Sequence, residues 1–274
     1  MFEHILVATD FSLSSLAAVW SARELALRAN GRVTLAHVLA PTASEGIVRE
    51  ALEEVRANIL DGMDVELALL KHPRADVAIC GHATVVHPDV IVAGRHGEHR
   101  LDERLIGTTT ERIVRHAPCS TFVVHPVQRE ALTSLERIAV GYDFSESSLP
   151  AIDAAKQLAK LFDAAITLLH VYDVLPPVPV LEDSSSAGAD FTTMCNNALE
   201  KLRREELHDV RSSKYVARDK STVTGIVEYA DDHQIDLLVL GTHGRTGASR
   251  LLLGSVAERT VRHAPCAVLV VKRR

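Results

Sequence analysis

The sequence has few aromatic residues and no excess of positive charge, and both shortages exclude a class of function. Phe, Trp and Tyr make up 4% of its 274 residues, too few for the ring platforms on which single-stranded nucleic acids stack. The formal net charge is −6, so no surplus of Lys and Arg predicts a footprint on a phosphate backbone. We therefore expect no nucleic-acid partner.

Long apolar runs and closely spaced cysteines are also missing. No apolar run reaches the roughly 18 residues that a membrane-spanning helix needs, and the start "MFEHILVATD" lacks the basic and apolar regions of a secretion signal. The four cysteines lie far apart, without Cys-x-x-Cys spacing, which is typical of a reducing compartment. We expect a cytoplasmic protein with no membrane partner.

What the sequence does contain is an internal repeat. "ILVATDFSLSSLAA" (5–18) matches "IAVGYDFSESSLPA" (138–151), with Asp143 following Asp10 by 133 positions. From Gly94 and Gly241 onward the offset is 147, so the second half has gained 14 residues. The Pro- and Ser-rich stretch 173–190 is the expected place, as a loop. The repeat predicts two domains, 1–128 and 135–274.

Each half alternates strands with helices. The predicted strands are 4–9, 32–38, 64–70, 89–94 and 120–125, then 137–142, 165–171, 214–219, 236–241 and 267–272. The predicted helices are 13–29, 46–60, 73–83 and 106–116, then 146–162, 191–208, 222–233 and 254–263. Continuously apolar strand cores such as "LLVLG" indicate strands covered on both faces. The pattern predicts an α/β fold of two tandem, doubly wound parallel sheets, which is Rossmann-like.

An aspartate follows the first strand of each half. Asp10 and Asp143 come at carboxyl strand ends, where open α/β sheets bind ligands. Each carboxylate either accepts hydrogen bonds from a ligand or opens the next helix, since "DFS" is a good helix entry. Position alone leaves both interpretations open.

A glycine passage follows the fourth strand of each half. Its spacing is Gly94-x2-Gly97-x9-Gly107-Thr108, and it recurs from Gly241 to Ser255. Glycines let the backbone approach a bulky anion, and a helix N-terminus favours phosphate. The passage is neither a Walker A loop nor the dinucleotide fingerprint. As an alternative, "TTTE" (108–111) and "SVAE" (255–258) match capping boxes, which need no ligand.

Together, "TDFS", the G-x2-G-x9-G-[ST] passage and "APC" before an apolar last strand resemble the ATP-binding branch of the universal stress protein family, over essentially the whole chain. The resemblance implies an adenine-nucleotide alpha-hydrolase-like fold, with adenine at the Asp and at the backbone of Val38 or Val171, and phosphates along the glycines. In the first half the implied nucleotide-binding residues are Ala8, Thr9, Asp10, Val38, Gly94, Arg95, His96, Gly97, Gly107, Thr108 and Thr109. In the second half they are Gly141, Tyr142, Asp143, Val171, Gly241, Thr242, His243, Gly244, Arg245, Gly254, Ser255 and Val256.

The family also dimerises through its last strand. The resemblance therefore implies that the two halves pair through 120–125 and 267–272, related by a pseudo-twofold, and it leaves a homodimer open. Between the second and third glycines the first half has "EHRLDERLI", of charge −1, and the second has "RTGASRLLL", of charge +2. We expect nucleotide in both sites, bound more tightly in the second.

The implied function is an ATP-binding regulatory module of the stress response. Whether Mg²⁺ binds together with ATP is left open. One alternative is a slow ATPase or adenine-nucleotide hydrolase, with His96 and His243 as acid/base groups; packing of these loop residues is favoured, and no catalytic residue is assigned. Another is an interaction scaffold with empty sites, which the acidic first loop favours.

The remaining histidines and cysteines have structural interpretations. His37 and His170 end apolar strands as structural residues, and Cys119 and Cys266 are expected as small core residues. A redox-sensing role for Cys80 or Cys195 is left open. "CGHATVVH" (80–87) fits no common zinc spacing, so we expect no metal site.

Overall fold

A computed structural model of the chain describes residues 1–97, 106–125, 135–173, 184–242 and 253–273. The first half consists of β1 (His4–Ala8), α1 (Leu13–Ala29), β2 (Arg32–Leu39), α2 (Glu45–Ile59), β3 (Val65–Lys71), α3 (Ala75–Val86), β4 (Val90–Gly94), α4 (Thr108–His116) and β5 (Ser120–Val124). The second consists of β6 (Arg137–Gly141), the 3-10 turn η1 (Glu146–Ser148), α5 (Leu149–Phe162), β7 (Ala165–Tyr172), α6 (Ser184–Glu206), β8 (Ser212–Arg218), α7 (Thr222–Asp232), β9 (Leu237–Gly241), α8 (Ser255–His263) and β10 (Ala267–Val271).

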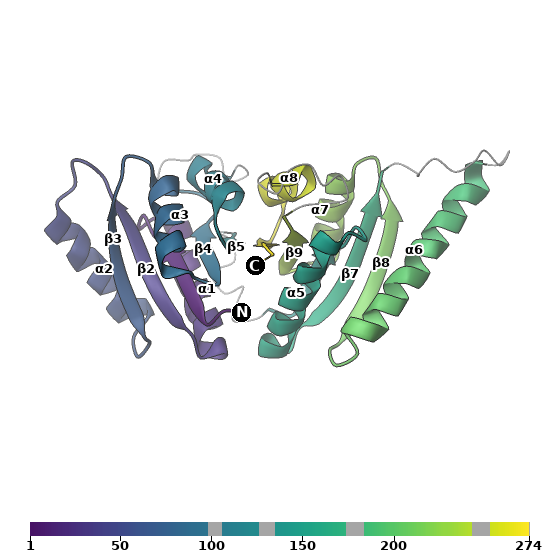
Figure 1. The fold of residues 1–274 in the computed structure, drawn as a ribbon, viewed down its shortest axis with the longest axis horizontal. Coiled ribbons are helices and arrows are strands. Elements are labelled where there is room, and N and C mark those ends of the chain that lie inside the picture. The colour runs from purple at the N-terminus through teal and green to yellow at the C-terminus, as the bar shows by residue number, and fades with distance from the viewer. Residues whose placement is uncertain (98–105, 126–134, 174–183, 243–252, 274) are drawn as a thin grey trace.

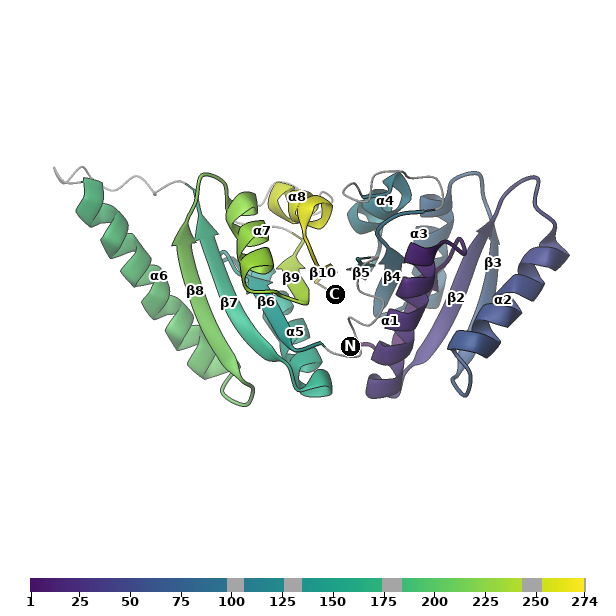
Figure 2. The same ribbon diagram turned by 180° about the vertical axis from the view of Figure 1, so that it is seen from behind.

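The strands form one continuous sheet in the order β3-β2-β1-β4-β5-β10-β9-β6-β7-β8 (Figures 1 and 2). Neighbouring strands within each half are parallel. Where the halves meet, β10 pairs antiparallel with β5, placing Leu269 opposite Phe122. The α/β fold with a mostly parallel sheet, predicted from the alternating elements, is confirmed.

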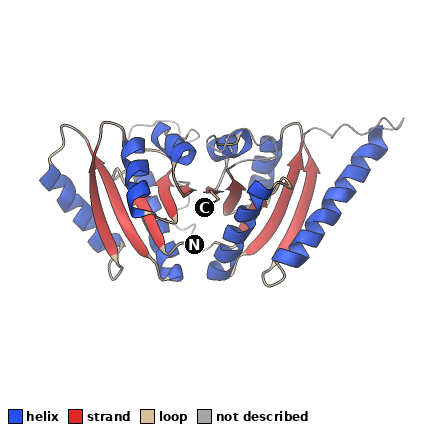
Figure 3. Ribbon diagram, in the orientation of Figure 1, coloured by secondary structure: helices blue, strands red, loops and turns tan. Residues whose placement is uncertain are grey.

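Helices cover both faces of the sheet (Figure 3). One face carries α1, α2, α5 and α6, whose apolar residues share a core cluster that runs through both halves. The other face carries α3, α4, α7 and α8 over two further clusters. Because strands such as β4 and β10 are buried along their whole length, their sequences are apolar without alternation.

The second half differs from the prediction at α6. The stretch 173–190 was expected as a loop, with a helix from 191, but the helix begins at Ser184 and has 23 residues, against 15 in α2. Serine is only mildly unfavourable in a helix, so the Ser-rich run continues the helix that follows it. None of the helices in the described ranges is both long and apolar enough to cross a membrane.

Side chains from each half bind the helix ends of the other half. The buried Arg95 guanidinium donates to the carbonyl oxygens of Ala264, at 2.6 Å, and Arg262, where α8 ends. In return, Lys272 Nζ donates to the carbonyl oxygen of Ala117, at 2.8 Å, where α4 ends. A cation at a helix C-terminus meets the negative end of its dipole, so both contacts hold the halves together.

Two arginines and two glutamates cross between α4 and α8 beside these contacts. Arg115 lies 2.7 Å from Glu258, and Arg262 lies 3.0 Å from Glu111. Each arginine also approaches the glutamate of its own helix, at 3.7 and 3.6 Å. We call this group the α4–α8 quartet; its four charges sum to zero.

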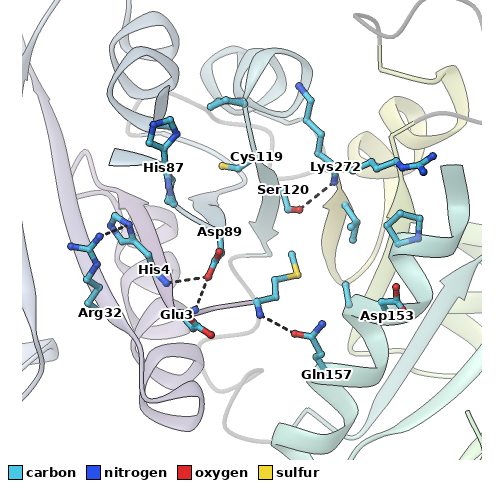
Figure 4. Close-up of a pocket in the computed structure, with 18 residues that line it drawn as sticks. Glu3, His4, Arg32, His87, Asp89, Cys119, Ser120, Asp153, Gln157 and Lys272 are labelled. Atoms are coloured by element: carbon cyan, nitrogen blue, oxygen red, sulfur yellow. Dashed lines mark hydrogen bonds between the residues drawn. The ribbon is translucent and has the colours of Figure 1, made fainter. Parts of the chain in front are cut away.

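A cavity of about 830 Å³ lies between the halves, at the start of β1 and the end of β10 (Figure 4). Its walls are joined by hydrogen bonds that cross the junction: the Met1 amine donates to Gln157 Oε1 at 3.0 Å, and the Lys272 backbone N–H donates to Ser120 Oγ at 3.2 Å. These bonds add to the pairing of β5 and β10.

We expect Arg95→Met to lower the free energy of unfolding by about 2 kcal/mol, because one buried and one partly buried carbonyl oxygen lose a charged donor. Urea unfolding of the full chain measures the change. Arg49→Met, at an exposed ion pair on α2, is the matched control and is expected to cost well under 1 kcal/mol. Equal losses in the two variants would contradict the role given to Arg95.

Candidate functional site

Each half has a cavity at the carboxyl ends of its parallel strands. The first cavity encloses about 610 Å³ where β1, β2 and β4 end and α4 begins. The second cavity encloses about 350 Å³ at the matching ends of β6, β7 and β9, in front of α8. Both volumes lie within the range of small-molecule sites, and this edge is where open α/β sheets bind ligands.

The residues named from the sequence gather around these two cavities. The first cavity is lined by Ala8, Thr9, Asp10, Val38, Gly94, His96, Gly97, Gly107, Thr108 and Thr109. The second is lined by Gly141, Tyr142, Asp143, Val171, Gly241, Thr242, Gly254, Ser255 and Val256. His243, Gly244 and Arg245 lie outside the described residues.

Arg95 does not line the first cavity, which corrects its place in the predicted site. Its guanidinium points into the junction between the halves and donates to the end of α8. The sequence offered no signal for this, because the partner is a helix end 167 positions away in the chain. Its counterpart Thr242 does line the second cavity.

Asp10 serves the turn that opens α1 and also lines the first cavity. Its Oδ1 accepts from the Ser12 N–H at 3.1 Å and from Ser12 Oγ at 2.6 Å. A Cβ on Gly97 would lie 2.6 Å from the other oxygen, Oδ2, so a larger residue there would require the Asp10 carboxylate to shift. Asp143 repeats the turn with Ser145 in the second half. The turn interpretation of the strand-end aspartates is therefore confirmed, and ligand binding by them stays a prediction.

The capping boxes predicted at α4 and α8 are wrong. The N-cap residues are Gly107 and Gly254, and neither helix start has a side-chain cap hydrogen bond. With glycine at the cap, Thr108 and Ser255 become the first helical residues, and both are exposed. The glutamates three residues later join the α4–α8 quartet instead. Both helix starts therefore face the cavities with backbone N–H groups and an exposed hydroxyl, a natural anion site.

The first glycine of each passage has a packing role. A Cβ on Gly94 would lie 2.5 Å from the Ser14 carbonyl oxygen, and one on Gly241 would lie 2.6 Å from that of Ser147. Only glycine lets the start of the α1 or η1 segment pass this close to the strand end. Thr110 Oγ1 also donates to the Gly94 carbonyl oxygen at 2.7 Å, tying α4 to β4.

The strand-two histidines line the cavities as well as holding strand ends together. His37 Nδ1 bonds the Thr9 carbonyl oxygen at 2.9 Å, and His170 Nδ1 bonds that of Tyr142 at 2.7 Å. These bonds agree with the structural role expected from the sequence. The sequence did not place either ring at the site, although both precede the valines that it did name.

Of each cavity floor, the sequence named only the central residue, Ala8 or Gly141, and missed the two residues that flank it. Ala36, Ala8 and Ala93 lie side by side on β2, β1 and β4 and line the first cavity. Leu169, Gly141 and Leu240 occupy the same places on β7, β6 and β9 and line the second. We call each set of three the strand-end row. Once the sheet register is known, aligning the two halves identifies the residues of both rows.

The pKa of His125, which follows β5, lies well below its usual value. Burial, together with the positive charges of Arg95 and His96, lowers its pKa to about 4. The ring is therefore neutral at neutral pH, beside the buried Arg95 guanidinium.

The cysteines are poorly suited to redox sensing. Burial raises the pKa of Cys80 to about 11, and those of Cys119 and Cys266 to about 12, while Cys195 is buried at 2% exposure. The thiolate is the reactive form, so these thiols are inert near neutral pH. Among the described residues, no group of three or more His, Cys, Asp or Glu side chains is placed to hold a metal ion.

Known proteins resemble this chain over its whole length. The model of the universal stress protein family matches residues 1–125 and 134–272. A universal stress protein of Mycolicibacterium smegmatis is 30% identical over 298 residues, covering 98% of this chain and 97% of the relative. One of Methanocaldococcus jannaschii is 32% identical over 165 residues, covering 56% of this chain and 91% of the relative. The crystal structure of a universal stress protein from Archaeoglobus fulgidus has the same fold, with a TM-score of 0.74 at 18% identity and full coverage of both chains.

We expect the neutral His125 ring to make stability depend on pH. Its pKa is lower in the folded chain, about 4, than in the unfolded chain, about 6.5. Its contribution is complete above pH 6.5 and is lost as the pH falls toward 4. Allowing for solvent around a half-buried ring, the loss between pH 7 and pH 5 is about 1 kcal/mol. Urea unfolding of wild type and His125→Gln measures it; an unchanged pH slope in the variant would contradict the assignment.

We expect the native protein to react slowly with a thiol reagent at pH 7.5. Cys195 and Cys266 are buried, Cys80 and Cys119 are partly buried, and burial raises the pKa of Cys80, Cys119 and Cys266. All four groups should react within minutes after unfolding in guanidinium. The absorbance of the thiolate that the reagent releases measures the reaction. The unfolded chain is the control that gives the total number of reactive thiols. Rapid labelling of one native thiol would show that burial does not protect it.

Proposed function

Because the chain belongs to the universal stress protein family, we propose that it is an adenine-nucleotide-binding regulatory module that takes ATP at the strand ends. The observation that carries the proposal is the helix start at each cavity. There, a glycine N-cap, an exposed hydroxyl and free backbone N–H groups meet at the carboxyl edge of the sheet.

The residues of the first cavity fit the parts of such a ligand. Phosphates suit the start of α4 at Gly107 and Thr108, where helix dipole and N–H groups favour negative charge. The base suits the opposite end, where Val38 and its backbone lie among apolar side chains. Mg²⁺ bound to the phosphates would reduce their charge.

The pairing of the two halves supports a regulatory role. The α4–α8 quartet joins the two helices whose N-termini face the two cavities. A ligand at either helix start therefore acts on an element that contacts the other half. We propose that nucleotide occupancy is read out by a partner through this junction, which serves as a dimer interface built into one chain; further homodimerisation and a cytoplasmic location are part of the same proposal.

We expect Thr108→Asp to weaken ATP binding at the first cavity at least about tenfold, because the new carboxylate repels phosphate at close range. The same residue favours the helix, since an acidic group suits the first turn. Isothermal titration of the full chain with ATP and Mg²⁺ measures binding, and thermal unfolding measures the fold.

Ser255→Asp makes the matching change at the second cavity. Gly46→Asp is the control, because it adds the same charge to the first turn of α2, whose residues line neither cavity. Wild-type affinity in the double variant Thr108→Asp, Ser255→Asp would contradict the proposed phosphate sites. An absence of ATP binding by the wild-type protein would contradict the proposed function itself.

A further inference from the structure

The two cavities differ at their floors. Residues opposite one another on neighbouring parallel strands project to the same side of the sheet, so each strand-end row forms one surface. In the first half that surface carries three methyl groups, from Ala36, Ala8 and Ala93. In the second half two leucines flank a glycine that has no side chain.

Leu240 and Gly141 fit one another closely. A Cβ on Gly141 would lie 2.5 Å from Leu240 Cδ2, a distance at which atoms overlap. Leu240 therefore occupies the space that the Ala8 methyl fills in the first half. Leu240 is 4% exposed and Leu169 is 1% exposed, so neither side chain has room to move aside without repacking the core.

The second cavity is also the smaller of the two. Its volume is about 350 Å³, against about 610 Å³ for the first. Tyr142, in the place of Thr9, adds further bulk, and its ring packs against Phe144 at 5.2 Å between ring centres. The floor of the first cavity carries only methyl groups, which leaves room for the face of a bicyclic base.

Building on the nucleotide binding proposed above, we propose that the strand-end row decides which half accepts a purine base. Ala36, Ala8 and Ala93 admit the base to the first cavity, whereas Leu169 and Leu240 exclude it from the second. The first half then holds the high-affinity nucleotide site, and the second holds the same nucleotide at least about tenfold more weakly.

This ranking is the reverse of the one that loop charge predicts. The residues between the second and third glycines give the second half an advantage of three charge units, but attraction between charges in water falls steeply with salt and distance. Steric overlap with a buried side chain is not screened, and one extra methylene in an apolar pocket already changes binding by about 10- to 200-fold. The two leucines carry six more carbon atoms than the two alanines they replace.

Exchange of the two rows tests the proposal on the full chain. The triple variant Ala8→Gly, Ala36→Leu, Ala93→Leu gives the first cavity the floor of the second. The triple variant Gly141→Ala, Leu169→Ala, Leu240→Ala makes the reverse exchange. Every introduced residue already occupies the same place in the other half, and the glycine exchange avoids the overlap seen between Leu240 and a Cβ at 141.

Isothermal titration with ATP and Mg²⁺ is the measurement. We expect one tight site in wild type, lost in Thr108→Asp and retained in Ser255→Asp. The first triple variant should lose at least about tenfold in affinity. The second should raise the number of tight sites from one to two, and should restore tight binding when combined with Thr108→Asp. CTP, with its smaller base, should discriminate less between the two halves.

Circular dichroism and thermal unfolding verify that each variant is folded, and single Ala36→Leu and Leu169→Ala replace any triple variant that is not. Loss of tight binding in Ser255→Asp rather than Thr108→Asp would overturn the ranking while leaving nucleotide binding intact. Unchanged stoichiometry after the second exchange would overturn the role of the row. Failure of wild type to bind ATP would overturn the proposed function, and the ranking with it.

Discussion

The antiparallel pairing of β5 with β10 is the contact on which the rest of the structure depends. Both strands are short and fully buried, and together they join two parallel half-sheets into one sheet of ten strands. A buried strand edge without a partner would leave backbone groups unsatisfied. The pairing also brings α4 beside α8, so that Arg95, Lys272 and the α4–α8 quartet reach across the junction.

The site geometry follows from this arrangement and from small residues at strand ends. Glycine at 94 and 241 lets the start of α1 or η1 approach the strand end, and glycine at 107 and 254 caps a helix without a side chain. Each cavity therefore has polar backbone at one end and apolar strand residues at the other. That combination suits a ligand with an anionic group and a flat, apolar part.

The fold and most of the site could be predicted because their signals are local or repeated. Apolar strands, helix periodicity and the doubled glycine spacing all lie within short stretches of the chain. Arg95 could not be placed, because its partners are carbonyl oxygens of a distant helix end. The capping boxes failed because a glycine one residue earlier took the cap position. The strand-end rows needed the sheet register, which brings Ala36 beside Ala8 and Leu169 beside Gly141.

Fusion of the two halves into one chain allows equivalent positions of their junction to carry different residues. In a symmetric homodimer, the same patch faces itself and every substitution appears on both sides. Here Arg95 is matched by Thr242 and Lys272 by His125, so equivalent positions carry different residues. The second half therefore has no arginine at the position equivalent to Arg95 that would repel its guanidinium. The neutral imidazole of His125 lies near this guanidinium. Covalent linkage thus allows the residues on each side of the junction to change independently, and the residues of the two cavity floors differ as well.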